Sequence, residues 1–142
     1  MSSLPRSLIL STARCHLRFP ECNLAPEILK HVTDERFPRD LPWALAKSLD
    51  DISDRLTQIH EKWDEGSAFC LAATANSDGR YLGLMTVTST EPDVWAIAYT
   101  ILPSEWRRGY ATECARCTMN FGFERLMARR IWAGAASWNA SS

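Results

Sequence analysis

The spacing of apolar residues divides the first half of the chain into three predicted elements. Apolar and polar residues alternate from residue 8 to residue 19, which predicts one half-buried strand. Residues 24–32 fit a short helix. Residues 50–63 repeat apolar side chains at three- and four-residue steps and therefore predict an amphipathic helix, for which Gly66 supplies the stop signal.

The second half of the chain predicts a sheet that continues through a crossover helix. Its predicted elements are strands at 68–74, 81–89, 94–102 and 131–136 and a helix at 111–126. Short turns join the first three strands, so they form an antiparallel meander. The helix links the third strand to the fourth, and a strand–helix–strand unit makes its two strands parallel. We expect a single α+β domain over residues 1–142, with helices flanking a mixed sheet.

Composition and charge narrow the class of protein. Hydrophobic residues make up 46% of the 142 residues and charged residues 23%, which is the balance of an ordinary globular domain. The formal net charge of −1 provides no broad basic field for nucleic acid or an anionic membrane. No apolar run approaches the ~20 residues that a membrane span needs. We therefore expect a cytoplasmic protein that binds neither nucleic acid nor membrane.

The cysteines indicate free thiols rather than disulfides or a metal site. Five cysteines form no regular framework, as a disulfide-stapled domain would require. Cys114 and Cys117 form a C-x-x-C pair, but they lie inside the predicted helix. A second pair of ligands at a suitable spacing is missing from the sequence. No metal is expected.

A basic turn between the third strand and its helix is the strongest candidate for chemistry. Pro103 ends the strand, and Arg107 and Arg108 precede Gly109 and Ala111, which are small enough to let backbone amides approach a ligand. A helix N-terminus presents unpaired N–H groups and the positive end of the helix dipole. This order of strand, basic turn and helix predicts a phosphate-binding site, the alternative being a solvated cationic turn.

Three motifs resemble the GNAT N-acetyltransferases, and more narrowly their RimJ/RimL-type branch. The run R-R-G-Y-A-T-E after Y-T-I-L-P-S-E-W resembles the acetyl-CoA signature of that family. Residues Thr12–Arg18 resemble the T-x-R-L-x-L-R opening of the branch. Asn139 and Ser142 fit its Asn-x-x-Ser, the alternative being that they are only polar residues near the end of the chain.

The resemblance implies a sheet whose central parallel strands splay apart to admit the pantetheine arm of acetyl-CoA. Small residues around Gly134 would leave room for that arm. Ser142 would protonate the departing sulfur, and the backbone of Ile101 would donate to the oxyanion. No metal takes part. The implied acetyl-CoA-binding residues are Tyr99, Thr100, Ile101, Leu102, Arg107, Arg108, Gly109, Tyr110, Ala111, Thr112 and Asn139.

The general base is the weakest part of this assignment. In the implied reaction a primary amine attacks the thioester directly and must first lose a proton. The branch often carries a Glu where this chain has Ala96. Glu91 and Asp93 are nearby alternatives, although turn carboxylates are usually solvated. Glu113 is explained more simply by the helix dipole, and His60 by a surface position.

Two functions remain open at this stage. One is an N-acetyltransferase acting on a protein N-terminus, a polyamine or a drug-like amine. The other is an inactive acyl-CoA-binding or interaction module, because the family pattern continues beyond residue 142 with a helix and a strand pair that this sequence lacks. A nucleoside triphosphate enzyme is disfavoured because the sequence has no G-x-x-x-x-G-K-[ST] motif. Without the last strand pair, an apolar sheet edge at 131–136 would favour a homodimer.

Overall fold

The computed structural model describes residues 4–133, and its elements follow the predicted order. The strands are β1 (Ile9–Ser11), β2 (Cys15–Arg18), β3 (Ala68–Ala75), β4 (Tyr81–Glu91), β5 (Val94–Ile101) and β6 (Arg130–Ala133). The helices are α1 (Ala25–Thr33), α2 (Leu49–Glu65) and α3 (Tyr110–Glu124). The predicted α+β class is confirmed.

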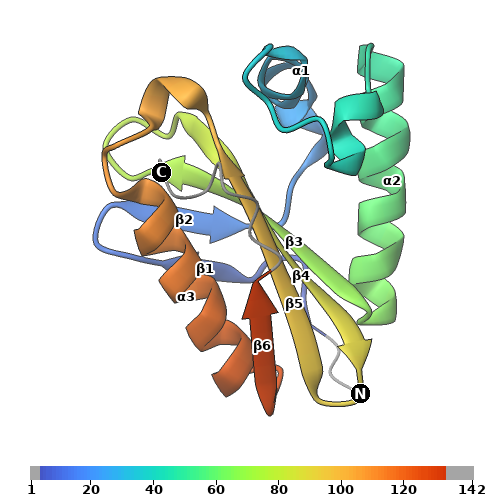
Figure 1. Cartoon of the computed structure of the whole chain (residues 1–142), viewed down its shortest axis with the longest axis vertical. Coiled ribbons are helices and arrows are strands. Elements are labelled where there is room, and N and C mark those ends of the chain that lie inside the picture. Colours follow the sequence, from blue (N-terminus) through green and yellow to red (C-terminus); the bar gives the residue numbers. More distant parts are fainter. Residues whose placement is uncertain (1–3, 134–142) are drawn as a thin grey trace.

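All six strands form one sheet in the order β1-β2-β3-β4-β5-β6. Neighbours are antiparallel from β1 to β5, whereas β5 and β6 are parallel and pair from Val94–Arg130 to Ile97–Ala133. The predicted meander and parallel pair are therefore both confirmed. The expected splaying of the parallel pair, the remainder of the 131–136 strand and Gly134 lie outside the described residues. Figure 1 shows α3 on one side of the sheet and α1 and α2 on the other.

The N-terminal stretch corrects the single strand predicted for residues 8–19. It folds as the β1–β2 hairpin because Thr12 builds a turn. The Thr12 N–H donates to the carbonyl of Cys15 over 2.9 Å, and the Cys15 N–H donates to the Thr12 hydroxyl over 2.9 Å. Such side-chain-to-backbone bonds compete with strand pairing. The predicted alternation holds within β2, where Cys15 and Leu17 are buried and Arg18 is exposed.

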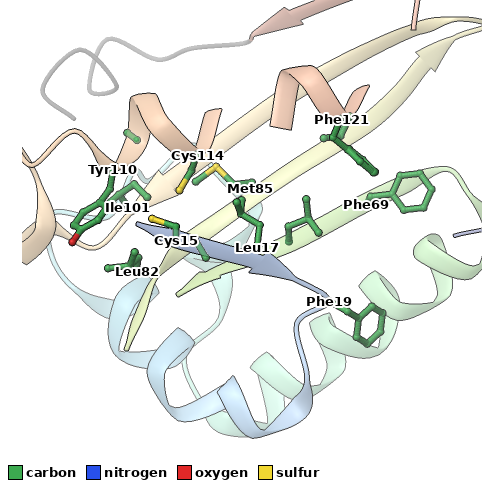
Figure 2. Close-up of a cluster of buried hydrophobic side chains, with 14 of the residues drawn as sticks. Cys15, Leu17, Phe19, Phe69, Leu82, Met85, Ile101, Tyr110, Cys114 and Phe121 are labelled. Atoms are coloured by element: carbon green, nitrogen blue, oxygen red, sulfur yellow. The ribbon is translucent and has the colours of Figure 1, made fainter. Parts of the chain in front are cut away.

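Two hydrophobic clusters cover the two faces of the sheet. Figure 2 shows the cluster between the sheet and α3, in which Met85 and Leu17 lie near Cys114. The second cluster packs α1 and α2 on the opposite face through Ile28 and Leu56. β3, the sequence AFCLAATA, is buried along its whole length because both faces are covered.

The helix boundaries follow ordinary capping rules. Ser48 caps α2, since its hydroxyl accepts a 3.2 Å bond from the Asp51 N–H, and Gly66 ends the helix at φ 80°. α3 begins one residue earlier than predicted, at Tyr110, and ends at Glu124. None of the helices within residues 4–133 is long and apolar enough to cross a membrane.

Candidate active site

The basic turn leads from the end of β5 into α3, as the sequence predicted. Gly109 stands at the N-cap of α3 in the left-handed conformation, with φ 82°. A left-handed residue followed by helical residues turns successive N–H groups toward one side, which creates an anion-binding concavity. The Tyr110, Ala111 and Thr112 amides occupy the first turn, where no intrahelical acceptor exists. The arrangement therefore suits a phosphate group.

Space for a ligand borders this turn. A hollow of about 970 Å³ lies between the β1–β2 hairpin and α3, and its wall includes Gly109, Thr112 and Arg116. The Arg107 and Arg108 side chains are exposed. Arg107 also adopts a left-handed backbone, with φ 66°, which is uncommon for a non-glycine residue. The turn thus presents both amides and cationic side chains to the solvent.

An ion pair between Arg80 and the buried Glu105 lies behind the turn and holds it in place. Glu105 is only 8% exposed and accepts two bonds from Arg80, at 3.0 and 3.1 Å. The same guanidinium donates to the Tyr110 hydroxyl over 3.3 Å and pairs with Asp78 at 3.0 Å. Hydrogen bonding by Arg80 lowers the pKa of Glu105, so this carboxylate stays charged at neutral pH. Arg108 also approaches Glu105, at 3.5 Å.

Two motif segments that are far apart in the sequence, Thr12–Arg18 and residues 107–113, meet at Glu113. This carboxylate accepts bonds from the Thr12 hydroxyl, from the Arg14 N–H over 2.9 Å and from the Arg14 guanidinium over 2.7 Å. Burial acts to raise the pKa of Glu113, but these bonds outweigh it and lower the pKa overall. Arg14 also stacks over the Tyr110 ring at 4.4 Å. Glu113 therefore joins the β1–β2 hairpin to α3, which the helix dipole alone did not predict.

The pairing of β5 with β4 determines which amide N–H groups of β5 point away from β4. The Leu102 N–H donates to the Leu82 carbonyl over 2.8 Å, and hydrogen-bonded pairs alternate along antiparallel strands. Thr100 and Leu102 therefore pair with β4, whereas Tyr99 and Ile101 point their amides toward the opposite edge. Among the described residues, β6 pairs with β5 only as far as Ile97. The Ile101 amide, whose role as an oxyanion donor stays a prediction, consequently points away from β4.

Close approach of β4 fixes the end of β5. A Cβ at Gly83 would meet the Thr100 carbonyl oxygen and the Ile101 Cα, which lies at 2.9 Å, so only glycine fits. On the other side the Trp106 indole donates to the Ile101 carbonyl over 2.9 Å. The last residues of β5 are thereby held from both sides. Sequence analysis missed Gly83, although a lone glycine within a strand pattern is a signal of close backbone approach.

A buried histidine also contacts this strand end. His31 of α1 is 1% exposed; its Nδ1 lies 2.9 Å from the Tyr81 hydroxyl and its Nε2 lies 3.3 Å from the Thr100 hydroxyl. Burial lowers the pKa of His31 from 6.5 to about 4, so the imidazole is neutral at pH 7. Sequence analysis missed it, although it falls on the apolar stripe of Ile28 and Val32.

The other residues singled out from the sequence lie elsewhere. His60 donates a 2.8 Å hydrogen bond from Nε2 to the Pro20 carbonyl, and its ring lies 4.4 Å from the Phe19 ring, the satisfied position that was expected. All five cysteines are free, including Cys114 and Cys117. No metal-binding group of side chains occurs among residues 4–133. The remaining candidates, Asn139 and Ser142, lie outside the described residues.

A partly open cavity of about 460 Å³ lies on the α2 side of the sheet. Its walls come from α2, from residues 41–43 and from the facing strands β3, β4 and β5, where Ala98, Tyr99 and Thr100 line it. The cavity therefore opens onto the same end of β5 that the turn follows. A volume of this size is typical of small-molecule sites.

The mixed sheet, the basic turn between β5 and α3 and the cavity beside β5 together fit the architecture of an acyltransferase. The chain belongs to the GNAT acetyltransferase family, because the acetyltransferase (GNAT) domain matches residues 14–142. The protein is accordingly an acyltransferase of that family, related in fold to RimJ/RimL-type enzymes. A comparison with curated protein sequences found no match.

Solved structures share this fold at low sequence identity. A Vibrio cholerae protein proposed to be a ribosomal-protein-serine acetyltransferase has a TM-score of 0.82 and 16% identity, over 96% of this chain and 79% of its own. A Bacillus anthracis GNAT acetyltransferase has a TM-score of 0.78 and 15% identity, over 95% and 78%. Mycobacterium smegmatis RimJ in complex with CoA-disulfide has a TM-score of 0.76 and 15% identity, over 89% and 67%.

Proposed function

We propose that this protein is an N-acetyltransferase that transfers an acetyl group from acetyl-CoA to a primary amine. The observation that carries the proposal is the turn from Gly109 to Thr112, whose amides face one side at the start of α3 and whose position is held by the Arg80–Glu105 pair. Family membership supports the same reaction. The structural neighbour RimJ, which was solved with a CoA-disulfide, supports CoA as the donor.

In the proposed complex the pyrophosphate of acetyl-CoA binds the Gly109–Thr112 amides and the Arg107 and Arg108 side chains. The pantetheine arm runs beside β5 and pairs with the outward backbone groups of Tyr99 and Ile101, close to Thr100 and Leu102. An anion at this helix N-terminus gains from both the amides and the dipole. Asn139 remains a predicted pantetheine ligand.

The chemistry follows from these positions. The free amine attacks the thioester carbonyl, and the Ile101 N–H donates a hydrogen bond to the oxyanion of the tetrahedral intermediate. The carbon–sulfur bond then breaks, and the CoA thiolate takes a proton, for which Ser142 is the predicted donor. One ammonium and one acetyl-CoA thus give one acetamide, one CoA thiol and one proton released to solvent.

A second candidate function, an acyl-CoA-binding module without turnover, has one specific observation in its favour. No Asp or Glu lines the 460 Å³ cavity among the described residues, and Ala96 stands where the branch often carries a Glu. Among the described residues, this cavity therefore supplies no carboxylate base for the incoming ammonium. In this reading the same turn binds CoA, but transfer is slow.

A thiol-release assay separates the two functions. The chain is incubated with acetyl-CoA and a panel of primary amines, comprising peptide N-termini and small amines, and CoA thiol is measured against an amine-free control. Amine-dependent thiol release together with mass-spectrometric detection of the acetamide is the expected result. CoA binding without acetamide for any amine would support the binding module, and an absence of CoA binding to folded protein would refute both.

The reducing cytoplasm is the compartment that suits the chain. All five cysteines are free, and burial raises the pKa of the Cys15 and Cys114 thiols, which keeps them protonated and unreactive. We include cytoplasmic location in the proposal on this basis.

A further inference from the structure

The 460 Å³ cavity is the place from which an acceptor would reach the thioester, if the proposed function holds. Ala98, Tyr99 and Thr100 of β5 form part of its wall, and these residues belong to the strand segment assigned to the acetyl-CoA arm. A molecule in the cavity therefore lies against the strand that positions the reacting carbonyl. The volume admits a ligand about the size of a short peptide.

The charged groups that line the cavity are all cationic. Arg55 and Lys62 lie on one face of α2, seven residues or about two helical turns apart, and both line the cavity. No Asp or Glu does so among the residues that the structure describes. Neither cation takes part in an ion pair within residues 4–133; the Arg55 guanidinium lies 5.5 Å from the centre of the Trp43 ring.

None of the six acidic residues of α2 lines the cavity, and two of them bind partners elsewhere. Asp64 pairs with Arg6 at 2.7 Å on the exposed side, and Asp51 caps the start of the helix through the Lys47 N–H. The opposite wall supplies the hydroxyls of Thr86 and Thr88, which are uncharged. Among the described residues that line the cavity, no acidic side chain therefore offsets the positive charges of Arg55 and Lys62.

We propose that the acceptor is an amine that also carries an anionic group, which Arg55 and Lys62 bind while the amine faces β5. An arginine or lysine unpaired in a partly enclosed wall gains a charge-assisted hydrogen bond from a carboxylate or phosphate. A polyamine would instead place further positive charge beside these cations and be repelled. Amino acids and short peptides with a free carboxylate are the substrate class that this charge distribution favours.

Matched acceptor pairs test the inference by thiol release at fixed acetyl-CoA. Glycine, diglycine and triglycine are each compared with their C-terminal amides, in which a neutral amide replaces the carboxylate, and each rate is referred to the concentration of free amine. Phosphoethanolamine is compared with ethanolamine so that a phosphate is distinguished from a carboxylate, and spermidine represents the polyamines. One of the two kinds of anionic acceptor, carboxylate or phosphate, should be preferred. We expect kcat/KM for that kind to exceed kcat/KM for its neutral partners by roughly tenfold or more.

Variants assign the preference to the two cations. Arg55→Met and Lys62→Met should each lower the ratio of kcat/KM for the anionic acceptor to kcat/KM for its neutral partner toward one. Lys30 is an exposed lysine of α1 outside the cavity, so Lys30→Met should leave this ratio unchanged. Acetyl-CoA affinity, measured by calorimetry, should be the same in all three variants. A preference that persists in both cavity variants would overturn the inference.

Failure of this inference is distinguishable from failure of the proposed function. If acetyl-CoA binds and neutral amines or spermidine are turned over at least as fast as anionic amines, the proposed acceptor class is wrong. The proposed acetyltransferase function is then still supported. Acetyl-CoA binding with turnover of no acceptor in the panel also overturns the acceptor class. Absence of acetyl-CoA binding refutes the proposed function, and the acceptor class with it.

Discussion

Acidification should destabilise this protein through His31 in particular. The imidazole is 1% exposed and contacts the Tyr81 and Thr100 hydroxyls, so it is buried in the neutral form. Its pKa falls from 6.5 to about 4 on folding because burial disfavours the charged imidazolium. Between these values the unfolded chain binds more protons than the folded chain. Stability therefore rises with pH across this window and is lost as pH falls through it.

The magnitude follows from the size of the shift. A difference of about 2.5 between the ordinary pKa and the folded pKa corresponds in full to about 3.4 kcal/mol at 1.36 kcal/mol per unit. Between pH 7.5 and pH 4.5 the loss is about 2.5 kcal/mol, because the folded imidazole begins to protonate near the lower limit. This is a large share of the total stability of an ordinary domain.

Urea unfolding at pH 7.5, 6.5, 5.5 and 4.5 measures the effect in the wild type and in His31→Gln. Glutamine keeps two hydrogen-bonding groups but does not titrate, so the variant retains every other source of acid sensitivity. Wild type should lose about 2.5 kcal/mol more than the variant over this range. Parallel curves for the two proteins would show that His31 is not buried in the neutral form, and would refute the reasoning.

Three further predictions concern the turn, the strand end and the sheet edge. Gly83→Ala should lower the free energy of unfolding by ~1–3 kcal/mol, because the added Cβ meets the backbone of β5; an unchanged urea midpoint would contradict this. Glu105→Gln should cost ~1–3 kcal/mol in the same assay, since it removes the buried charge that binds Arg80. Asp64→Asn at an exposed pair should cost clearly less, and equal losses would contradict the assigned burial. Trp132 is 48% exposed on the outer strand β6 and should promote self-association. Trp132→Lys should therefore shift the mass measured by light scattering toward the monomer. A wild type that is monomeric at high concentration would contradict this.

Local patterns in the sequence predicted most of the fold. The apolar stripe of residues 50–63 predicted α2 because an amphipathic helix must bury one face. The strand–turn–helix order around Gly109 was also predicted correctly, because that geometry depends on a few neighbouring residues; phosphate binding at the turn stays a prediction. The β1–β2 hairpin was missed because the alternation of apolar residues continues across Thr12, whose hydroxyl forms the turn.

The interactions that hold the site together could not be predicted from such local patterns. Arg14 and Glu113 are 99 residues apart, and Arg80 and Glu105 are 25 apart, so their pairing depends on strand register and helix position. Charged residues in a sequence are mostly solvated, which gives no ground to choose these four over the other charged residues. His31 likewise acquires its role only when α1 packs against the end of β5.

CoA should bind with its pyrophosphate at the Gly109–Thr112 turn. Calorimetric titration of CoA into wild type, Gly109→Asp and Gly79→Asp tests it most directly. Both glycines have a left-handed φ, 82° and 74°, so both variants carry similar backbone strain, but Gly79 lies in the β3–β4 turn outside the proposed CoA site. The account predicts that Gly109→Asp weakens CoA binding by roughly tenfold or more while Gly79→Asp binds like wild type. Equal affinity of Gly109→Asp and wild type would contradict it.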